Sequence, residues 1–163
     1  MSEHPAGIRI IGPDDGETLR RPQGHDRFIV PGDVSGGGLA LLEHFLFPRA
    51  LAGPVHRHSR EDEYSYVLEG RLGAILGGDE VMVEAGSLLS KPRGQWHTFW
   101  NASDDPVRVL EIISPGGFEQ AFRELSALEE PTPEAISELA ARYGVDVDFD
   151  ATMSVVERHG VTF

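Results

Sequence analysis

Two histidines and three acids stand close together in the segment GPVHRHSREDE, which spans residues 53–63. On a β-strand alternate side chains share a face, so His56 and His58 point the same way and Arg57 points away. Two imidazoles placed in this way can converge on one metal ion. Histidine pairs also occur on ordinary charged surfaces, so a metal site requires further ligands from neighbouring strands.

A second motif lies further along the chain. The segment from His56 to Gly70 has the pattern H-x-H-x4-E-x6-G, and the segment from Gly86 to Asn101 has the pattern G-x5-P-x-G-x2-H-x3-N. In this order and at this short separation, the two patterns resemble the two signature motifs of the cupin superfamily. Ala50 stands where that family usually has a glycine. This difference concerns the turn before the first motif and leaves the ligand positions in place.

The resemblance implies one divalent transition metal, with Fe, Mn, Co, Ni and Zn all compatible with nitrogen and oxygen donors. The implied ligands are His56, His58, Glu63 and His97. Glu63 takes the position of the family's carboxylate, and it begins the apolar run EYSYVLEG, so its side chain can point inward. Glu61 and Asp62 fall in the preceding loop, where we expect solvated side chains. In dioxygenase relatives the glutamate ligand doubles as a base, which makes Glu63 the catalytic candidate.

Short apolar runs of 4–9 residues, separated by Gly, Pro, Asn or Asp, follow one another from residue 39 to 114. Such spacing is typical of a β-sandwich or barrel. Together with the resemblance it predicts an all-β fold, a cupin jelly-roll (double-stranded β-helix) barrel with C-terminal α-helices. We expect one cupin domain over residues 1–163, with the barrel core at 39–114. Residues 1–38 supply N-terminal strands and loops, including the apolar pieces at 8–11 and 27–30.

Helical spacing appears only in the C-terminal extension, residues 115–163. Apolar residues recur at this spacing within 116–128 and again within 132–144, where Thr132 is a candidate N-cap and Pro133 suits the first helical position. A third short helix is expected from Asp150 to His159. We expect these helices to cover one face or end of the sheet.

Strand alternation also predicts which residues line the barrel interior. If Glu63 faces inward, Ser65 and Val67 do so too, and Phe99 shares a face with His97. Phe99 can equally be an ordinary core aromatic. In the run LALLEHFLF, either Glu43 or His44 must point inward. Whichever does is a candidate for acid–base chemistry, although it could also be a hydrogen-bonded core residue. The candidate substrate-binding residues are therefore Ser65, Val67, Phe99 and His44.

Composition narrows the class of protein. Of the 163 residues, 40% are hydrophobic and 25% are charged, as in an ordinary globular domain. The formal charge of −13 would repel a phosphate backbone or an anionic bilayer, so nucleic acid and membrane are not expected as partners. The chain has no cysteine, which excludes thiolate ligands and cysteine nucleophiles. The N-terminal residues 1–17 lack the apolar stretch of a signal peptide, and we expect a cytoplasmic protein.

Three functional hypotheses remain open at this stage, because the cupin fold hosts many chemistries. The first is a metal-dependent dioxygenase acting on a small enolic or aromatic substrate, since the small single barrel resembles bacterial quercetin (flavonol) dioxygenase-like cupins. The second is a non-redox isomerase, epimerase or lyase. The third is a non-catalytic cupin that binds a small molecule. The resemblance also implies a homodimer.

Overall fold

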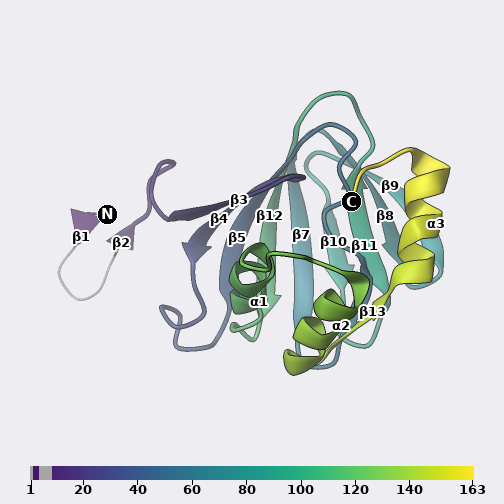
Figure 1. The fold of residues 1–163 in the computed structure, drawn as a ribbon. Coiled ribbons are helices and arrows are strands. Elements are labelled where there is room, and N and C mark those ends of the chain that lie inside the picture. Colours follow the sequence, from purple (N-terminus) through teal and green to yellow (C-terminus); the bar gives the residue numbers. More distant parts are fainter. Residues whose placement is uncertain (1, 4–8) are drawn as a thin grey trace.

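The structure is a computed structural model that describes the backbone of residues 2–3 and 9–163 and the side chains from Arg9 onward. Residues 1 and 4–8 lie outside the described part, and they include Ile8 of the expected N-terminal strand. Figure 1 shows two antiparallel sheets that face each other, with α1 and α2 in front of the strands and α3 beside β8 and β9. This is the cupin jelly roll that the sequence predicts, and its C-terminal helices are present.

The larger sheet has six strands in the order β10-β7-β12-β5-β4-β3, and the smaller has five in the order β13-β6-β11-β8-β9. The strand bounds are β1 Ser2–Glu3, β2 Arg9–Ile10, β3 Glu17–Arg21, β4 Gly24–Val30, β5 Ala40–Leu46, β6 Val55–His58, β7 Asp62–Glu69, β8 Arg71–Leu76, β9 Asp79–Glu84, β10 Leu88–Lys91, β11 His97–Asn101, β12 Val107–Ser114 and β13 Val145–Asp148. Strands β1 and β2 form a separate small ladder. The predicted barrel core at 39–114 contains β5 to β12, and β3 and β4 extend the larger sheet.

The inner faces of the two sheets form the core, and strand alternation decides which residues they contribute. On β7, Ser65 and Val67 are fully buried, whereas Tyr66 on the other face is 38% exposed. On β5 the alternation places His44 inside and Glu43 outside, where Glu43 pairs with Arg27 and Arg108. The open choice between these two residues is thus resolved in favour of His44.

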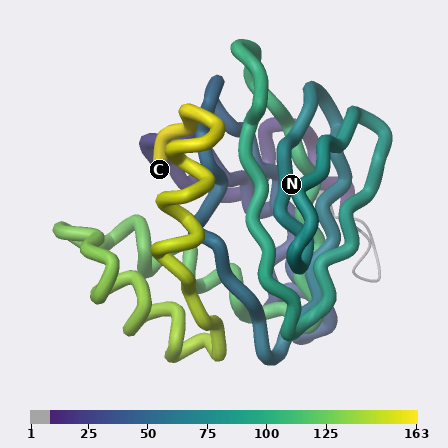
Figure 2. The backbone as a smooth tube through the Cα atoms, turned by 90° about the vertical axis from the view of Figure 1, so that its right-hand side faces the viewer, coloured from purple at the N-terminus to yellow at the C-terminus, as the bar shows by residue number. Residues whose placement is uncertain are grey.

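The three predicted helices are present as α1 Glu119–Ser126, α2 Pro133–Arg142 and α3 Phe149–His159. The Thr132 hydroxyl accepts a hydrogen bond from the Ala135 amide at 3.2 Å, so the expected N-cap of α2 is confirmed. Figure 2 shows the yellow α3 running along the outer side of the barrel, apart from the green α1 and α2. Phe118 at the start of α1 and Leu139 on α2 pack into the same core cluster as Phe28 and Leu42 of the barrel.

The sequence analysis predicts only helices in the C-terminal extension, but the structure also has a strand there, β13. Its four residues pair with β6 along the whole length of that strand, so Val145 lies opposite His58 and Val147 opposite His56. Helix α3 covers the outer side, where the Thr152 hydroxyl accepts a hydrogen bond from the Val55 amide at 2.9 Å. Strand β6, which carries the histidine pair, is therefore held by β13, β11 and α3. Among the described residues, no helix is long and apolar enough to cross a membrane.

Candidate metal centre

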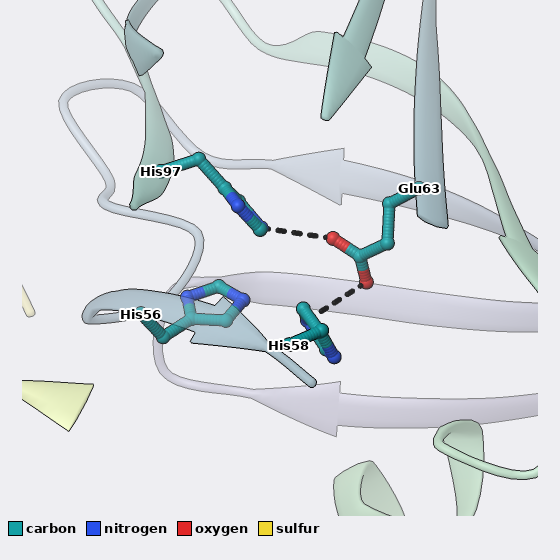
Figure 3. Close-up of side chains that lie close together, drawn as sticks. All are labelled: His56, His58, Glu63 and His97. Carbon is teal, nitrogen blue, oxygen red and sulfur yellow. Dashed lines mark hydrogen bonds and ion pairs between the residues drawn. The ribbon is translucent and has the colours of Figure 1, made fainter. Parts of the chain in front are cut away.

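Four side chains from three strands meet at one end of the barrel interior (Figure 3). His56 and His58 come from β6, His97 from the adjacent β11, and Glu63 from β7 in the opposite sheet. Each offers one ligand atom, and these atoms all lie within 4.8 Å of one another. His97 is the direct cross-strand partner of His56, which explains how residues far apart in sequence reach one point.

The three imidazoles are oriented by hydrogen bonds at Nδ1. His56 Nδ1 lies 2.7 Å from the Pro54 carbonyl oxygen, and His97 Nδ1 lies 3.0 Å from that of Gln95. His58 Nδ1 lies 3.1 Å from Glu61 Oε2. An oxygen at each Nδ1 favours the tautomer protonated there and turns each Nε2 toward the centre of the group, where His97 Nε2 lies 3.0 Å from Glu63 Oε2.

One buried atom, His58 Nε2, indicates that the site suits a metal ion. Nε2 of His58 is buried and has no hydrogen-bond partner in the described part of the chain. Glu63 Oε1 lies 3.4 Å from it, close enough for an ion pair but outside hydrogen-bond geometry. A buried polar atom without a partner is costly, and a divalent ion would satisfy it together with the other three donors. Three imidazoles and a carboxylate suit Fe, Mn, Co, Ni or Zn.

The protonation states that the surroundings favour are those of metal ligands. Burial lowers the pKa of His56 well below its usual range, and the neighbouring His97 and His58 lower it further, so this imidazole is neutral. Burial raises the pKa of Glu63, but Lys91 and His58 outweigh this effect and hold it well below the usual range. Glu63 is therefore a carboxylate. Metal binding requires these two states.

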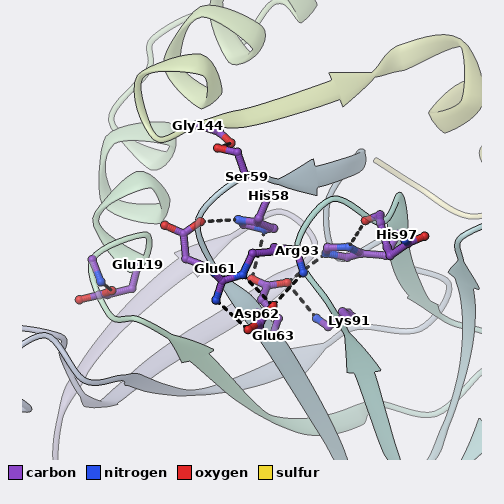
Figure 4. Close-up of polar contacts among 12 residues, drawn as sticks. His58, Ser59, Glu61, Asp62, Glu63, Lys91, Arg93, His97, Glu119 and Gly144 are labelled. Atoms are coloured by element: carbon purple, nitrogen blue, oxygen red, sulfur yellow. Dashed lines mark hydrogen bonds and ion pairs between the residues drawn. The ribbon is translucent and has the colours of Figure 1, made fainter.

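The expectation that Glu61 is a solvated loop residue is wrong. Its side chain is buried at 6% exposure and turns back to His58, three residues earlier, as Figure 4 shows. Asp62, by contrast, begins β7 and points outward to Arg93, whose guanidinium donates to it at 2.8 Å. The Arg93 side chain and amide lower the pKa of Asp62 to about 2. The two neighbouring acids thus have different roles.

This difference gives a test of the orienting role. We expect Glu61→Gln to lower metal affinity by about 10–100-fold, the usual loss when a group that orients a ligating histidine is changed. Gln keeps the size of the side chain but loses the charge that stabilises the Nδ1–H tautomer of His58. Isothermal titration with Zn²⁺ measures the change. Asp62→Asn is the matched control and should bind as tightly as wild type. Equal affinities for both variants would contradict the assignment.

Sequence reasoning missed a row of buried charges that crosses the inner face of the larger sheet. Lys91 on β10 lies opposite Glu63 on β7, and its Nζ lies 3.1 Å from Glu63 Oε2 and 2.7 Å from Glu111 Oε1. The other oxygen of Glu111 accepts a hydrogen bond from Ser65 at 2.5 Å. Burial lowers the pKa of Lys91, but Glu111 and Glu63 outweigh it and raise that pKa. Lys91 is therefore an ammonium ion inside the barrel.

A cavity of about 450 Å³ opens beside this row, and its walls are mainly apolar. His56 and Glu63 line it, as do Lys91, Glu111, Phe118 and Phe122. Of the four predicted substrate-binding residues, Phe99 and His44 are among the lining residues. Ser65 and Val67 are not: Ser65 is fully buried against Glu111, and Val67 is fully buried in the core cluster with Phe99. The inward direction predicted for these two residues is confirmed, but they lie outside the cavity lining.

A family comparison agrees with the fold and with the position of the four ligand candidates. Residues 44–113 match the family model of the cupin domain, and both motif histidine groups lie inside that segment. This match agrees with the motifs, and the segment is similar to the cupin domain.

The chain is similar to several named proteins. Tetracenomycin polyketide synthase protein TcmJ of Streptomyces glaucescens is 32% identical over 95 residues, which cover 58% of this chain and 64% of that protein. Polyketide synthase CurC of Streptomyces cyaneus is 35% identical over 60 residues, which cover 37% and 39%. Oxidoreductase iacF of Pestalotiopsis fici is 44% identical over 48 residues, which cover 29% and 24%. The chain thus spans less than two thirds of the length of each of these relatives.

Solved structures share the fold at lower identity. KdgF from Halomonas sp. superposes with a TM-score of 0.60 at 17% identity, covering 69% of this chain and 98% of that one. A sugar phosphate isomerase of the cupin superfamily from Silicibacter pomeroyi gives a TM-score of 0.56 at 22% identity, covering 65% and 75%. At such identities the likeness concerns the fold and not the reaction.

Proposed function

We propose that the protein is a metal-dependent cupin enzyme for an enolic or phenolic aromatic substrate, with oxygen-dependent cleavage by a dioxygenase as the first candidate reaction. The observation that carries this proposal is the mainly apolar cavity whose lining includes His56 and Glu63 of the candidate metal centre. Its volume of about 450 Å³ suits a small organic ligand. Phe99, Phe118 and Phe122 supply aromatic surface against which a planar ring can pack.

The names of the relatives support the same substrate class. Two of the similar proteins are named as polyketide synthase proteins, and a third is named an oxidoreductase. Polyketide intermediates contain β-dicarbonyl groups that enolise, and aromatic polyketides contain phenols. We therefore include polyketide-derived aromatics among the substrates of this site.

The chain's own groups fit the chemistry of such a substrate. A divalent ion at the four ligands would supply a Lewis acid and, if redox-active, electrons for the reaction with dioxygen. Glu63 is the group that accepts the proton of the enol or phenol at its carboxylate. The Lys91 ammonium lies beside it on the cavity wall and stabilises the negative charge that develops on the substrate oxygen. The apolar residues around them exclude water and strengthen both interactions.

A second reaction class also has a specific observation in its favour. The cavity wall includes His44, Lys91 and Glu111 besides the ligand candidates, so several proton donors and acceptors are spread along the larger sheet where a molecule in the cavity can reach them. Groups arranged in this way can move a proton from one atom of the substrate to another without oxygen. A non-redox isomerase, epimerase or lyase is the second candidate.

An oxygen electrode separates the two reactions. Protein loaded with Fe, Mn, Co or Ni is offered a panel of flavonols, β-diketones and phenolic acids in air and under argon. If the protein is a dioxygenase, oxygen uptake should match substrate loss, and the anaerobic mixtures should bind without reacting. Turnover that proceeds equally well under argon would exclude the dioxygenase and support the second class. Binding without turnover in every metal form would support a non-catalytic cupin instead.

A further inference from the structure

His44 lines the cavity on the larger sheet, two strands away from the strand of Glu63. Its Nδ1 lies 2.6 Å from Asp26 Oδ1, whereas Nε2 has no hydrogen-bond partner in the part of the chain that the structure describes. The ring lies between Phe99 and Phe122, with centroid distances of 6.0 and 5.9 Å. The imidazole is therefore fixed in orientation, and its second nitrogen remains available to a molecule in the cavity.

Asp26 is held in place by a second residue on its other side. Asp26 is fully buried on β4, directly opposite His44 on β5. Arg21 Nη2 donates to Asp26 Oδ1 at 2.9 Å, and Arg21 Nε lies 2.7 Å from Asp26 Oδ2. Arg21 also donates to the Ala52 carbonyl at 3.0 Å, which ties this arrangement to the other side of the cavity. A fully buried carboxylate needs such partners, because burial of an unpaired charge is very costly.

A histidine that only fills the core does not need an aspartate and an arginine to orient its ring. A structural imidazole inside a barrel is most simply satisfied at both nitrogens by hydrogen bonds, or replaced by an apolar residue. Here the fully buried Asp26, paired with the partly exposed Arg21, orients the ring, and the ring lines an apolar cavity. A carboxylate at Nδ1 of a histidine fixes the tautomer and stabilises the imidazolium that forms when Nε2 takes up a proton. The same arrangement of acid and imidazole activates histidines in many unrelated enzymes.

We propose that His44, oriented by Asp26 and Arg21, is a second proton-transfer group of the site, and that it receives the polar end of the substrate that lies away from the metal ligands. This proposal rests on the proposed function, because it takes the cavity as the substrate site. A proton leaves a substrate O–H or C–H for Nε2, the electron pair stays on the substrate as an enolate, and the imidazolium returns the proton to the product. Glu111, on the strand between those of His44 and Glu63, also lines the cavity.

The position of His44 also indicates which chemical groups the substrate carries. One oxygen function reaches the metal ligands at His56 and Glu63, and a second polar group reaches Nε2 of His44, with the aromatic walls of Phe99 and Phe122 between them. The molecule should therefore be an aromatic or enolic compound with polar groups at two separated positions, and not a simple monophenol.

Diethyl pyrocarbonate tests this proposal without knowledge of the substrate, since it acylates the unprotonated nitrogen of accessible histidines. The full-length, zinc-loaded protein is treated near neutral pH, and peptide mass spectrometry maps the products. We expect acylation of His44 in the folded protein, because Nε2 carries a free lone pair that faces the cavity. Absence of label on His44, under conditions that label the partly exposed His159, would overturn the proposal.

The orienting role of Asp26 has its own test in the same experiment. Asp26→Asn removes the charge at Nδ1, so the rate of His44 acylation should fall on the order of tenfold, while Asp33→Asn in an exposed turn leaves it unchanged. An unaltered rate in a folded Asp26→Asn protein would show that Asp26 does not act through His44. Metal content is measured in parallel and should stay at the wild-type level in both variants. A protein without bound metal would therefore contradict the proposed function, but the labelling of His44 would still test the role of His44.

Discussion

His58→Ala should remove the metal from the protein. Wild type should carry about one divalent ion per chain, whereas the variant should carry almost none after dialysis. The loss should exceed the ~10–100-fold typical for a group that only orients a ligand, because His58 supplies a donor atom itself. Its Nε2 is buried and has no hydrogen-bond partner among the described residues, and an alanine at this position leaves a gap in the wall of the centre. Elemental analysis of protein purified under identical conditions measures the change.

His25→Ala is the matched control for that experiment. His25 lies on the outer face of β4, where it stacks on Phe45 at a centroid distance of 4.5 Å, so it has no part in the metal centre. Its loss should leave the metal content unchanged. Circular dichroism should show the same β-signal for wild type and both variants, since the apolar strands form the core without the ion. Undiminished metal in a folded His58→Ala protein would remove the site assignment.

The sequence predicted the group of ligand candidates because the fold places motif residues on paired strands. His56 and His58 share one face of β6 by simple alternation, and the second motif leads into β11, which pairs with β6 at His97. Gly94, with a φ of +79°, makes the turn before His97, and its amide donates to the His58 carbonyl at 2.6 Å. Both motifs therefore contribute to the geometry as well as to the ligands.

What the sequence did not predict depends on contacts between strands that are distant in the chain. Glu61 belongs to a loop by its local composition, and only the turn that brings it back to His58 buries it. Strand β13 is short, and its four residues, Val145–Asp148, form a strand because β6 has a free edge. Its alternating VDVD pattern was a visible signal, although a weak one at that length.

The buried charges were also visible as interruptions of alternation. On β12 the inward residues are Val107, Val109, Glu111 and Ile113, so a single acid stands in an otherwise apolar row. Lys91 follows Leu89 on the inner face of β10 in the same way. Alternation alone cannot tell which of these charges meet, because that depends on the register between β10, β7 and β12. A charged residue in an inward strand position thus indicates a functional site. Its interaction partners can be identified only from the structure.

Glu63→Gln should separate the role of Glu63 as a ligand from its proposed role as a base. Gln keeps one oxygen donor and the shape of the side chain, so part of the metal should remain. Turnover should fall by a hundredfold or more, the size typical of a positioned general base. The barrel should stay folded, because Lys91 keeps its partner Glu111 at 2.7 Å when the charge at position 63 is lost. Turnover per bound metal ion is the quantity to compare, with a substrate that the oxygen-electrode panel identifies.

Glu69→Gln provides the control for this comparison, since Glu69 ends the same strand but lies in solvent and pairs with Arg108 at 2.6 Å. It should change neither metal content nor turnover. If Glu63→Gln loses metal and turnover in the same proportion, Glu63 is a ligand and no more, and the proton acceptor must be sought elsewhere in the cavity. His44 and Glu111 are then the remaining candidates on the cavity wall. The Lys91 ammonium outweighs the effect of burial, holds the pKa of Glu63 low and so weakens that carboxylate as a base. A ratio of turnover to metal that falls a hundredfold in Glu63→Gln would instead place the base at Glu63.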